Sequence, residues 1–479
     1  MLKPSTTTNA RILPAHVLAT VAALTAVALL GSLLISIDTE AATERTVMRG
    51  GHLVARAGFE QSIRHWKEVN GATRLSRVAG GHGGSRHAAR LRAPLSNRAT
   101  IGMTDAPSMV SHTGRGQVYR ATVWLKATRK AVRPSNLNAR IELSELSNGH
   151  QRVGAWRRIR LTNTRWHSVT VWLTARRDDH RLGVTIRAFD VRAGAAVKVD
   201  NVTVHKVATP RVRASVLRGT RYGASVDAGS GDWVKALHQS DRRYSRLDVV
   251  RFYDPDFPDS WTSSRLNAVN RPIVYSFAAK PGAVLSGQHD RQIRRWFNTA
   301  PARWPIWWSY RQEPEDDIAR GEYSAARYRQ AWRHVNQLAN GADNPRLHPT
   351  LILMCWTAYP NSGRRFSDYY PGDFIQVLGW DCYNTDTQMT RYKPARQIMR
   401  YAAAKARRLD KGFGVSEVGS RLLPGDDGSR RAMWLADVAR YTGHRNAAFV
   451  SYWDAQIPAG NFKLRDFPSR RTWRHVVSR

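Results

Sequence analysis

The chain has 479 residues, 42% of them hydrophobic, with 75 lysines and arginines against 37 acidic residues and only two cysteines. Its 17 Trp, 16 Tyr and 12 Phe supply ample material for buried cores, which excludes a disordered chain, and two cysteines cannot staple a disulfide scaffold of this length. The formal net charge of +38 predicts attraction to a polyanion, and the length predicts two or three domains.

Residues 1–45 are predicted to be a targeting segment. Lys3 and Arg11 precede an uncharged run, residues 17–37, whose 21 residues can cross a bilayer. The run is longer than a signal-peptide core, and Ala41 and Ala42 make a poor cleavage site, so a retained signal anchor is favoured over a cleaved signal peptide. In both cases the rest of the chain is exported, and nucleic acid is not expected as a partner.

Residues 46–207 are predicted to form an all-β domain. Apolar and polar residues alternate in runs separated by turn-forming clusters, at residues 117–127, 139–146, 166–174, 182–191 and 196–204. Seven or eight short strands over this length indicate a β-sandwich. The tryptophans of this domain are expected in the core or between the sheets; they are Trp66, Trp124, Trp156, Trp166 and Trp172.

Positive charge is concentrated in this domain. Residues 51–200 hold 27 lysines and arginines against nine acidic residues, or +18 in 150 residues, whereas residues 201–479 hold 44 against 25, or +19 in 279 residues. Two interpretations stay open: attraction to an anionic cell-envelope polymer, and a solvated arginine-rich surface. Residues 208–219 contain proline and arginine without periodicity and are predicted to be a linker.

Three motifs of the domain have a recognisable pattern. They are the opening Gly58-Phe59-Glu60 with Trp66, the strand Tyr119-Arg120-Ala121-Thr122-Val123-Trp124-Leu125-Lys126-Ala127, and the closing Val199-Asp200-Asn201-Val202-Thr203-Val204. With these motifs the domain resembles the jelly-roll carbohydrate-binding modules. The resemblance implies a sugar-binding module, and a spacer or adhesion module that binds no sugar is the alternative.

Residues 220–479 alternate short apolar runs with helical patterns. The apolar runs are residues 222–227, 247–253, 272–277, 305–310, 350–356, 374–380, 413–417 and 448–453. Helical patterns are clearest at residues 290–299, 325–339, 394–408, 430–441 and 470–477. Eight strand–helix repeats predict a (β/α)8 TIM barrel, with weak helices after the first, second and fifth strands. The predicted fold class is therefore an all-β sandwich followed by an α/β barrel.

Polar residues at the C-terminal ends of barrel strands are the candidates for chemistry. Glu313 follows the fourth predicted strand and Glu417 ends the seventh, so two carboxyls can face each other across the lumen. Retaining glycosidases need two carboxyls about 5–5.5 Å apart, one as nucleophile and one as acid/base. The other candidates are expected to bind substrate; they are Asp227, Arg251, Gln312, Trp380, Asp381, Tyr383 and Trp453.

Four stretches of this half carry a closer resemblance. They are Glu313-Pro314-Glu315-Asp316-Asp317, Leu351-Ile352-Leu353-Met354-Cys355-Trp356-Thr357, Asp368-Tyr369-Tyr370-Pro371-Gly372-Asp373 and Gly379-Trp380-Asp381-Cys382-Tyr383-Asn384. The barrel resembles glycoside hydrolases of the large clan with catalytic residues after strands four and seven, and within it family 26, the mannanase-like enzymes. The resemblance implies that Glu313 is the acid/base, Glu417 the nucleophile, Tyr383 its hydrogen-bond partner and Trp453 the floor of the sugar subsite.

One departure from that family stands beside the acid/base. Members usually have histidine where this chain has Gln312. Glutamine can still hydrogen-bond to a sugar hydroxyl, so glycosidase activity is still predicted. The substrate preference of the family is not carried over to this chain. Mannan is therefore one candidate among β-linked glycans.

Other signatures point away from metals and cofactors. The chain has no HExxH, no Gly-rich phosphate loop and no CxxC, so no metal and no cofactor are expected. Asp254, Asp256 and Asp259 form either an acidic rim of a sugar cleft, which is favoured, or a calcium site. Cys355 and Cys382 lie near the ends of neighbouring strands, and a disulfide and two buried thiols are equally compatible with that placement.

The sequence therefore predicts an exported monomer, membrane-anchored or secreted, that acts as a retaining endo-glycosidase on an extracellular or cell-envelope polysaccharide. The first alternative is a non-catalytic or transglycosylating polysaccharide-binding protein on the same barrel fold. The second is a basic adhesion protein for anionic envelope polymers.

Overall fold

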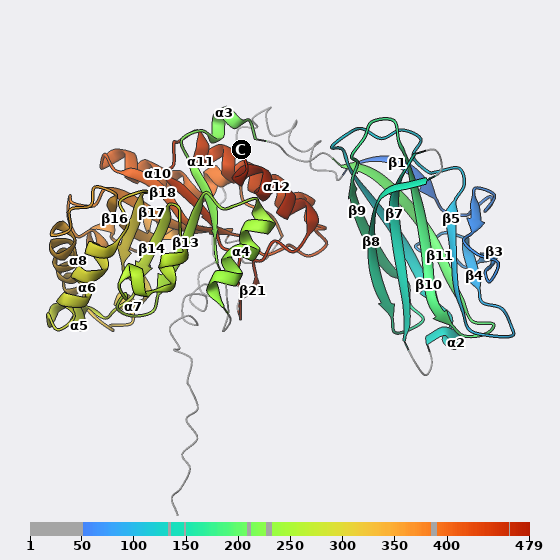
Figure 1. The fold of residues 1–479 in the computed structure, drawn as a ribbon, viewed down its shortest axis with the longest axis horizontal. Helices are drawn as coiled ribbons and strands as arrows, with labels where there is room; N and C mark the ends of the chain where they lie inside the picture. The colour runs from blue at the N-terminus through green and yellow to red at the C-terminus, as the bar shows by residue number, and fades with distance from the viewer. Residues whose placement is uncertain are drawn as a thin grey trace, which may run out of the picture. The chain divides into compact units, whose positions relative to one another are not determined.

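The computed structural model describes residues 51–132, 136–147, 150–207, 212–226, 232–384, 390–458 and 460–479. In this part of the chain, residues 51–207 and residues from 212 onwards belong to two compact units (Figure 1). The predicted membrane segment, residues 17–37, lies outside the described residues. Within them, no helix has the length and apolar character needed to span a membrane.

The first unit is a β-sandwich of two antiparallel sheets, which confirms the predicted fold. In the six-stranded sheet, the strands are β3 (Arg74–Ala79), β4 (His87–Arg92), β11 (Ala196–Val207), β6 (Val118–Ala127) and β9 (His167–Thr174), with β1 (His52–Ala57) paired to β11. In the five-stranded sheet, the strands are β2 (Trp66–Glu68), β5 (Ala99–Asp105), β10 (Arg181–Val191), β7 (Leu137–Ser147) and β8 (His150–Leu161). A single helical turn, α2 (Arg129–Val132), follows β6.

Side-chain alternation builds the core of this sandwich. Along β6, Val123 and Leu125 are fully buried between the sheets, while Trp124 and Lys126 face outward and stay partly exposed. The same alternation overturns the prediction that the tryptophans are core residues. Of the five, Trp66 joins the core, whereas the others lie outside it; they are Trp124, Trp156, Trp166 and Trp172.

The second unit is a closed barrel of eight parallel strands in chain order, as predicted. Its strands are β12 (Arg221–Ser225), β13 (Val249–Asp254), β14 (Ile273–Phe277), β15 (Ile306–Tyr310), β16 (Leu347–Met354), β17 (Val377–Tyr383), β18 (Gly412–Gly419) and β19 (Phe449–Tyr452). A short hairpin follows the last strand; it consists of β20 (Gln456–Ile457) and β21 (Gly460–Asn461).

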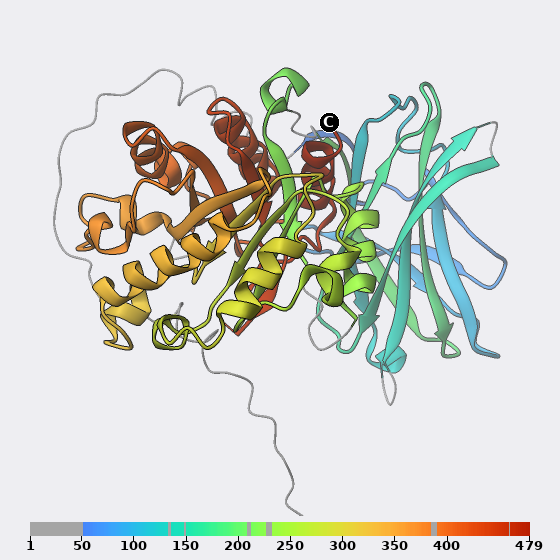
Figure 2. The same cartoon turned by 60° about the vertical axis from the view of Figure 1, so that its left-hand side comes forward.

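Helices cover the outside of the barrel (Figure 2). They are α4 (Trp233–Tyr244), α5 (Pro281–Leu285), α6 (Asp290–Thr299), α7 (Glu315–Ala319), α8 (Ala325–Asn340), α9 (Phe366–Tyr369), α10 (Ala395–Arg408), α11 (Ser429–Gly443) and α12 (Phe467–Val477). The second strand is followed by 3-10 turns, η3 (Trp261–Ser263) and η4 (Arg265–Ala268), and the fifth by η5 (Cys355–Ala358) and the one-turn α9. The second and fifth helices are therefore weak, as expected, whereas the first is a regular 12-residue helix.

Part of the predicted linker belongs to the barrel unit. Residues 208–211 lie outside the described residues, but α3 (Ala214–Leu217) follows them directly. Val212 and Leu217 are buried in the barrel core, and the carbonyl of Leu217 accepts a hydrogen bond of 2.6 Å from Nη1 of Arg479. Apolar residues at both positions explain why this stretch packs rather than remaining a free connection.

The barrel lumen changes character along its axis. Six side chains form a separate apolar cluster; they are Val249, Val274, Trp307, Ile352, Val377 and Phe449. Trp308, the next residue after Trp307, points the other way and packs on Trp332 of α8 at a ring-centroid distance of 5.2 Å. Nearer the C-terminal ends of the strands the lumen holds polar groups, among them buried Arg251, Ser276 and Ser309.

Candidate active site

A β-bulge brings Glu417 into the lumen. Trp380 of β17 is opposite Val415 of β18, but the next residue, Asp381, is opposite Glu417, so Ser416 is an extra residue. Val415 and Val418 both pack on the helix side of the barrel, which leaves Ser416 and Glu417 on the lumen side between them. Strict alternation would have turned Glu417 away from the lumen.

Two groups hold the carboxylate of Glu417. The hydroxyl of Tyr383 donates a hydrogen bond of 2.5 Å to Oε2, and Nη2 of Arg251 lies 3.5 Å from Oε1. Two hydrogen bonds orient Arg251: its Nη1 donates to the carbonyl of Phe252 at 2.7 Å and to Oγ of Ser276 at 2.9 Å. Arg251 is only 1% exposed, so the prediction that it binds substrate directly is wrong: its guanidinium lies beneath Glu417.

Glu313 comes from the loop between β15 and α7. Its backbone adopts a left-handed conformation with φ of +49°, and its amide donates a hydrogen bond of 3.1 Å to the carbonyl of Ile352 on the neighbouring strand β16. A glutamate in this conformation is strained, and such strain is typical of residues held at functional sites. The loop therefore fixes Glu313 at the C-terminal end of the barrel while leaving its side chain partly exposed.

The two glutamates differ in their electrostatic surroundings. Burial raises the pKa of Glu313 well above its usual value, and the negative charges of Glu417, Glu315 and Asp316 raise it further. Burial also raises the pKa of Glu417, but the guanidinium of Arg251 and the hydrogen bond from Tyr383 both act to lower it. Of the two carboxyls, these surroundings favour ionisation of Glu417 and protonation of Glu313.

A third carboxyl lies beside this pair. Asp381 is 4% exposed, stands opposite Glu417 in the sheet, and neither of its carboxyl oxygens has a hydrogen-bond partner among the described residues. Burial together with the charges of Glu417 and Glu313 raises its pKa well above the usual value. Asp381 can therefore be neutral when Glu417 is ionised, but both of its oxygens are buried, so the structure does not present them to a ligand.

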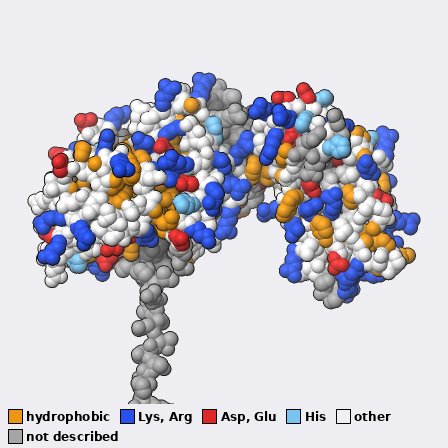
Figure 3. All heavy atoms as spheres, viewed as in Figure 1, with side chains coloured by type: hydrophobic (Ala, Val, Ile, Leu, Met, Phe, Trp, Pro, Cys, Tyr) orange, Lys and Arg blue, Asp and Glu red, His pale blue; other side chains and the backbone are white. Residues whose placement is uncertain are grey.

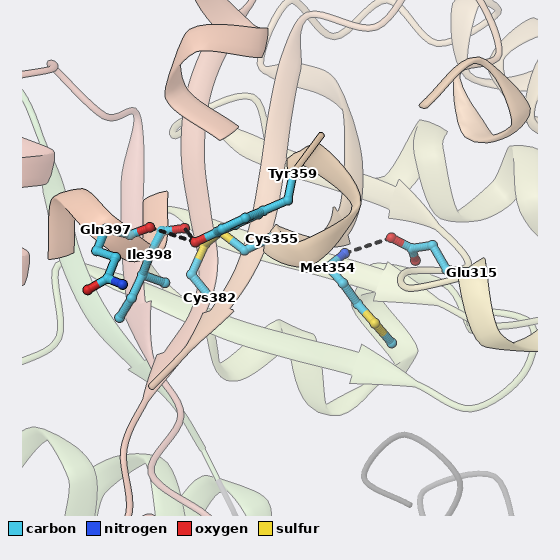
Figure 4. Close-up of a disulfide and its surroundings, with 7 residues drawn as sticks. All are labelled: Glu315, Met354, Cys355, Tyr359, Cys382, Gln397 and Ile398. Atoms are coloured by element: carbon cyan, nitrogen blue, oxygen red, sulfur yellow. Dashed lines mark hydrogen bonds between the residues drawn. A yellow bond between two sulfur atoms is a disulfide. The ribbon is translucent and has the colours of Figure 1, made fainter. Parts of the chain in front are cut away.

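The turn η5 after β16 is tied to its surroundings at three points (Figure 4). Cys355 forms a disulfide with Cys382 of β17, with a Cα–Cα distance of 5.0 Å, so the disulfide is the alternative that the structure adopts. Oε1 of buried Glu315 accepts hydrogen bonds from the amide of Met354 at 2.9 Å and from the hydroxyl of Thr357 at 2.6 Å. On the other side, the hydroxyl of Tyr359 donates to carbonyls of α10 at 2.6 and 2.9 Å.

This tethered turn carries an exposed tryptophan that the sequence places at the end of the fifth predicted strand, where an indole can stack on a sugar. Trp356 is 46% exposed and lies next to Tyr359, with ring centroids 5.1 Å apart. Its position directly after the fifth strand was readable from the sequence. Because the turn is held on both flanks, the indole is presented on a fixed support.

The remaining candidate site residues differ in their exposure and contacts. Trp380 is fully buried and packs on Phe366 at 6.4 Å on the helix side of the barrel, so its predicted stacking on a sugar is wrong. Trp453 is 8% exposed and stacks on half-exposed Tyr253 at 5.9 Å, and its contact with sugar stays a prediction. Gln312 is partly exposed, and its Oε1 has no hydrogen-bond partner in the described structure. Asp227 lies outside the described residues.

Metal ligation finds no support at the acidic loop after β13. Asp254 accepts hydrogen bonds from the hydroxyl of Tyr275 at 2.6 Å and from Nη2 of Arg265 at 2.8 Å. Across the described residues, no group of three or more His, Cys, Asp or Glu side chains is placed to hold a metal ion. The carboxylate of Asp254 therefore serves the packing of the loop.

Comparison with known proteins yields fold-level likenesses only. No family model and no curated protein matches the chain. A Cellvibrio japonicus xylanase 10C variant in complex with xylopentaose is 14% identical with a TM-score of 0.38, covering 86% of this chain and 99% of its own. The CBM22-1 and GH10 modules of Clostridium thermocellum endo-1,4-beta-D-xylanase 10B, with xylohexaose, are 12% identical with a TM-score of 0.35, covering 89% and 97%.

A third likeness concerns the first unit alone. The CBM22-1 xylan-binding domain of a Paenibacillus barcinonensis xylanase is 14% identical with a TM-score of 0.27, and it covers 34% of this chain and 98% of its own. Identities and TM-scores at this level carry no conclusion about what this chain binds or cleaves. The resemblance to family 26 stays a prediction.

Proposed function

We propose that the barrel is a retaining glycosidase that cleaves a β-linked extracellular or cell-envelope polysaccharide at internal positions. The observation that carries the proposal is the unequal environment of two neighbouring carboxyls. Arg251 and Tyr383 favour the anion of Glu417, whereas negative neighbours favour the acid form of Glu313. A retaining mechanism requires one carboxyl in each state at the same pH.

In this mechanism Glu313 protonates the glycosidic oxygen while Glu417 attacks the anomeric carbon. The C–O bond to the leaving group breaks and a covalent glycosyl-enzyme forms. Water then attacks the same carbon and gives its proton to Glu313, now the base, so Glu417 is released and the configuration is retained. Tyr383 and Arg251 position Glu417 throughout, because both contact its carboxylate.

Substrate binding is assigned to the polar and aromatic groups around this pair. Gln312 is partly exposed and can hydrogen-bond to a sugar hydroxyl, and Trp453 supplies an apolar face. Mannan is one candidate substrate, and the replacement of histidine by Gln312 is the reason to test other β-glycans beside it.

The test separates the roles of the two glutamates. Glu417→Ala should abolish turnover of every substrate. Glu313→Ala should lose activity on polysaccharide but keep it on aryl glycosides whose leaving group needs no protonation. Tyr310→Phe is the matched control. Tyr310 ends β15, the strand that precedes the Glu313 loop, and its hydroxyl donates to the carbonyl of Ala279 rather than to either glutamate. Equal losses on both kinds of substrate in the two glutamate variants would contradict the assignment.

A binding protein without turnover is the second candidate, and Gln312 is the observation that favours it. If the barrel only binds glycan, the wild type should retain a polysaccharide on an affinity gel without releasing reducing ends. Glu417→Gln should then bind as well as the wild type. Release of new reducing ends that Glu417→Gln abolishes would exclude this candidate.

The basic sandwich is proposed to retain the enzyme at its substrate. Residues 51–200 carry a formal charge of +18, and Lys and Arg side chains predominate over acidic ones on the face of this unit seen in Figure 3. Together with the membrane segment predicted at residues 17–37, this charge would hold the protein on an anionic cell envelope. Retention on cell-wall material should therefore weaken as salt rises, because exposed charges are screened within about 10 Å at 0.1 M ionic strength.

A further inference from the structure

Three cations stand in one row on the outer face of the six-stranded sheet. Arg90 of β4 is directly opposite Lys198 of β11, which is directly opposite Lys126 of β6. The residues on either side of each are buried between the sheets, so all three side chains point outward. At about 4.8 Å between neighbouring strands, the row places three positive charges within about 10 Å.

The row has little internal compensation. Nε of Arg90 donates to Oγ of Ser76 at 3.2 Å, and Nζ of Lys198 donates to the carbonyl of Ala79 at 2.8 Å. Within the described residues, no ion pair joins any of the three cations to a carboxylate. Burial lowers the pKa of Lys198, and the charges of Lys126 and Arg90 lower it further. Like charges directly opposite on a sheet destabilise it, so the fold gains nothing from this arrangement.

Aromatic rings close one end of the row. The ammonium of Lys126 lies 6.0 Å from the ring centroid of Trp166, and the imidazole of His82 stacks on Trp124 at 3.6 Å. Both tryptophans are partly exposed. The face therefore combines a line of positive charge with an apolar ring at its end.

We propose that this face, formed by Arg90, Lys198, Lys126 and Trp166, binds an anionic polysaccharide that carries a carboxylate on each sugar. Carboxylates would pair with the three cations in succession, and one pyranose would stack on Trp166. The proposal deepens the retention role of the sandwich and rests on it, but it is independent of the barrel's activity.

The pattern favours a glycan over single-stranded nucleic acid. Proteins that bind single strands place an aromatic ring under successive bases along the cationic groove. Here the three cations follow one another on adjacent strands with no ring between them, and the one ring in line stands at the end. Strong binding of an oligonucleotide would contradict this preference, so the experiment includes one.

The experiment uses the full chain in detergent and measures affinity for polygalacturonate, neutral galactan and a single-stranded oligonucleotide over a range of salt. The test variant replaces Arg90, Lys126 and Lys198 by glutamine. The matched control removes the same charge from the outward face of the other sheet, by replacing Arg158, Arg160 and Arg181, all exposed, by glutamine. Melting curves confirm that both variants are folded.

We expect polygalacturonate to bind and galactan not to bind. The test variant should lose about tenfold in affinity at low salt, because each exposed ion pair contributes up to a few-fold. Its slope of log affinity against log salt should fall by about three, one for each cation removed. The control variant should keep both values.

Equal weakening in both variants, or weakening in the control alone, would overturn the assignment to this face. Tighter binding of the oligonucleotide than of polygalacturonate would overturn the glycan. If the wild-type chain binds no polyanion even at low salt, the retention role itself fails, whereas a wild type that binds and a test variant that binds equally well refute only the cation row.

Discussion

Asp381 and Glu417 stand directly opposite each other on adjacent barrel strands, although an unbroken ladder from Trp380 and Val415 would have paired Asp381 with Ser416. The extra residue in β18 thus sets two carboxyls side by side, with Tyr383 and Arg251 on Glu417. The chemistry proposed for the barrel therefore depends on this β-bulge in β18.

Removal of the Tyr383 hydroxyl should slow the reaction and move its pH dependence. A hydrogen bond to a charged group is worth about 1.5–3 kcal/mol, so Tyr383→Phe should lower kcat/KM by about 10- to 150-fold. The bond from Tyr383 lowers the pKa of Glu417, so its loss raises that pKa and shifts the acidic limb of the pH–rate profile to higher pH. An unchanged acidic limb would show that Tyr383 does not act on the nucleophile.

Glu315 should make the barrel less stable at alkaline pH. Burial raises its pKa from 4.5 to about 7, so the folded state favours the protonated form. The stability it provides is complete below pH 4.5, declines as pH rises to about 7, and is lost above that. The difference corresponds to about 3 kcal/mol.

Glu315→Gln isolates this effect, because glutamine can still accept both hydrogen bonds through Oε1. The variant should match the wild type in melting temperature at pH 4.5 and exceed it at pH 8. Parallel pH dependences of the two proteins would contradict a titrating Glu315.

The disulfide should stabilise the barrel. It closes a loop with a sequence separation of 27 residues, for which chain entropy gives about 3.5 kcal/mol. Reductant should lower the denaturant midpoint of the wild type and leave that of the Cys355→Ala/Cys382→Ala variant unchanged. A wild type whose unfolding is insensitive to reductant, with the thiols shown to be free, would refute this stabilisation.

Trp356 should contribute to binding of long substrates. An aromatic contact is worth about 0.5–1.5 kcal/mol, so Trp356→Ala should raise KM for polysaccharide about 2- to 12-fold without changing kcat. Activity on a short aryl glycoside serves as the internal control and should be unchanged. A fall in kcat on both substrates would indicate that Trp356 supports the turn rather than the sugar.

The eight barrel strands were predictable because each is a short apolar run bounded by turns and helical patterns. The burial of Trp380 was also readable: Asp381 and Tyr383 are two residues apart and share the lumen side, so the residue before Asp381 must face the helices. The sequence predicts Glu417 at the end of the seventh strand, but alternation does not predict its inward direction, since strict alternation from Gly414 sends Ser416 inward and Glu417 outward. Only the bulge, a property of the folded ladder, reverses this.

The sandwich was harder to predict in detail. Strand β8 (His150–Leu161) carries four arginines, and one of them, Arg157, interrupts the alternation of Val153, Ala155 and Ile159, so the strand is absent from the runs that the sequence predicts. Trp156 on this strand is exposed rather than in the core, because strand direction, and not aromatic character, decides which face a ring occupies.

The apolar cluster low in the lumen determines how a polymer can meet this enzyme. Phe449 packs so closely against Gly414 that a Cβ added there would lie 2.4 Å from its ring, and Trp307 adjoins Phe449 at 4.9 Å. In the described residues the lumen is therefore filled on the side of the carboxyls away from the C-terminal ends of the strands. If the barrel has the proposed activity, a polysaccharide would reach the carboxyls only from the C-terminal ends of the strands, and both halves of a cut chain would leave from the same side.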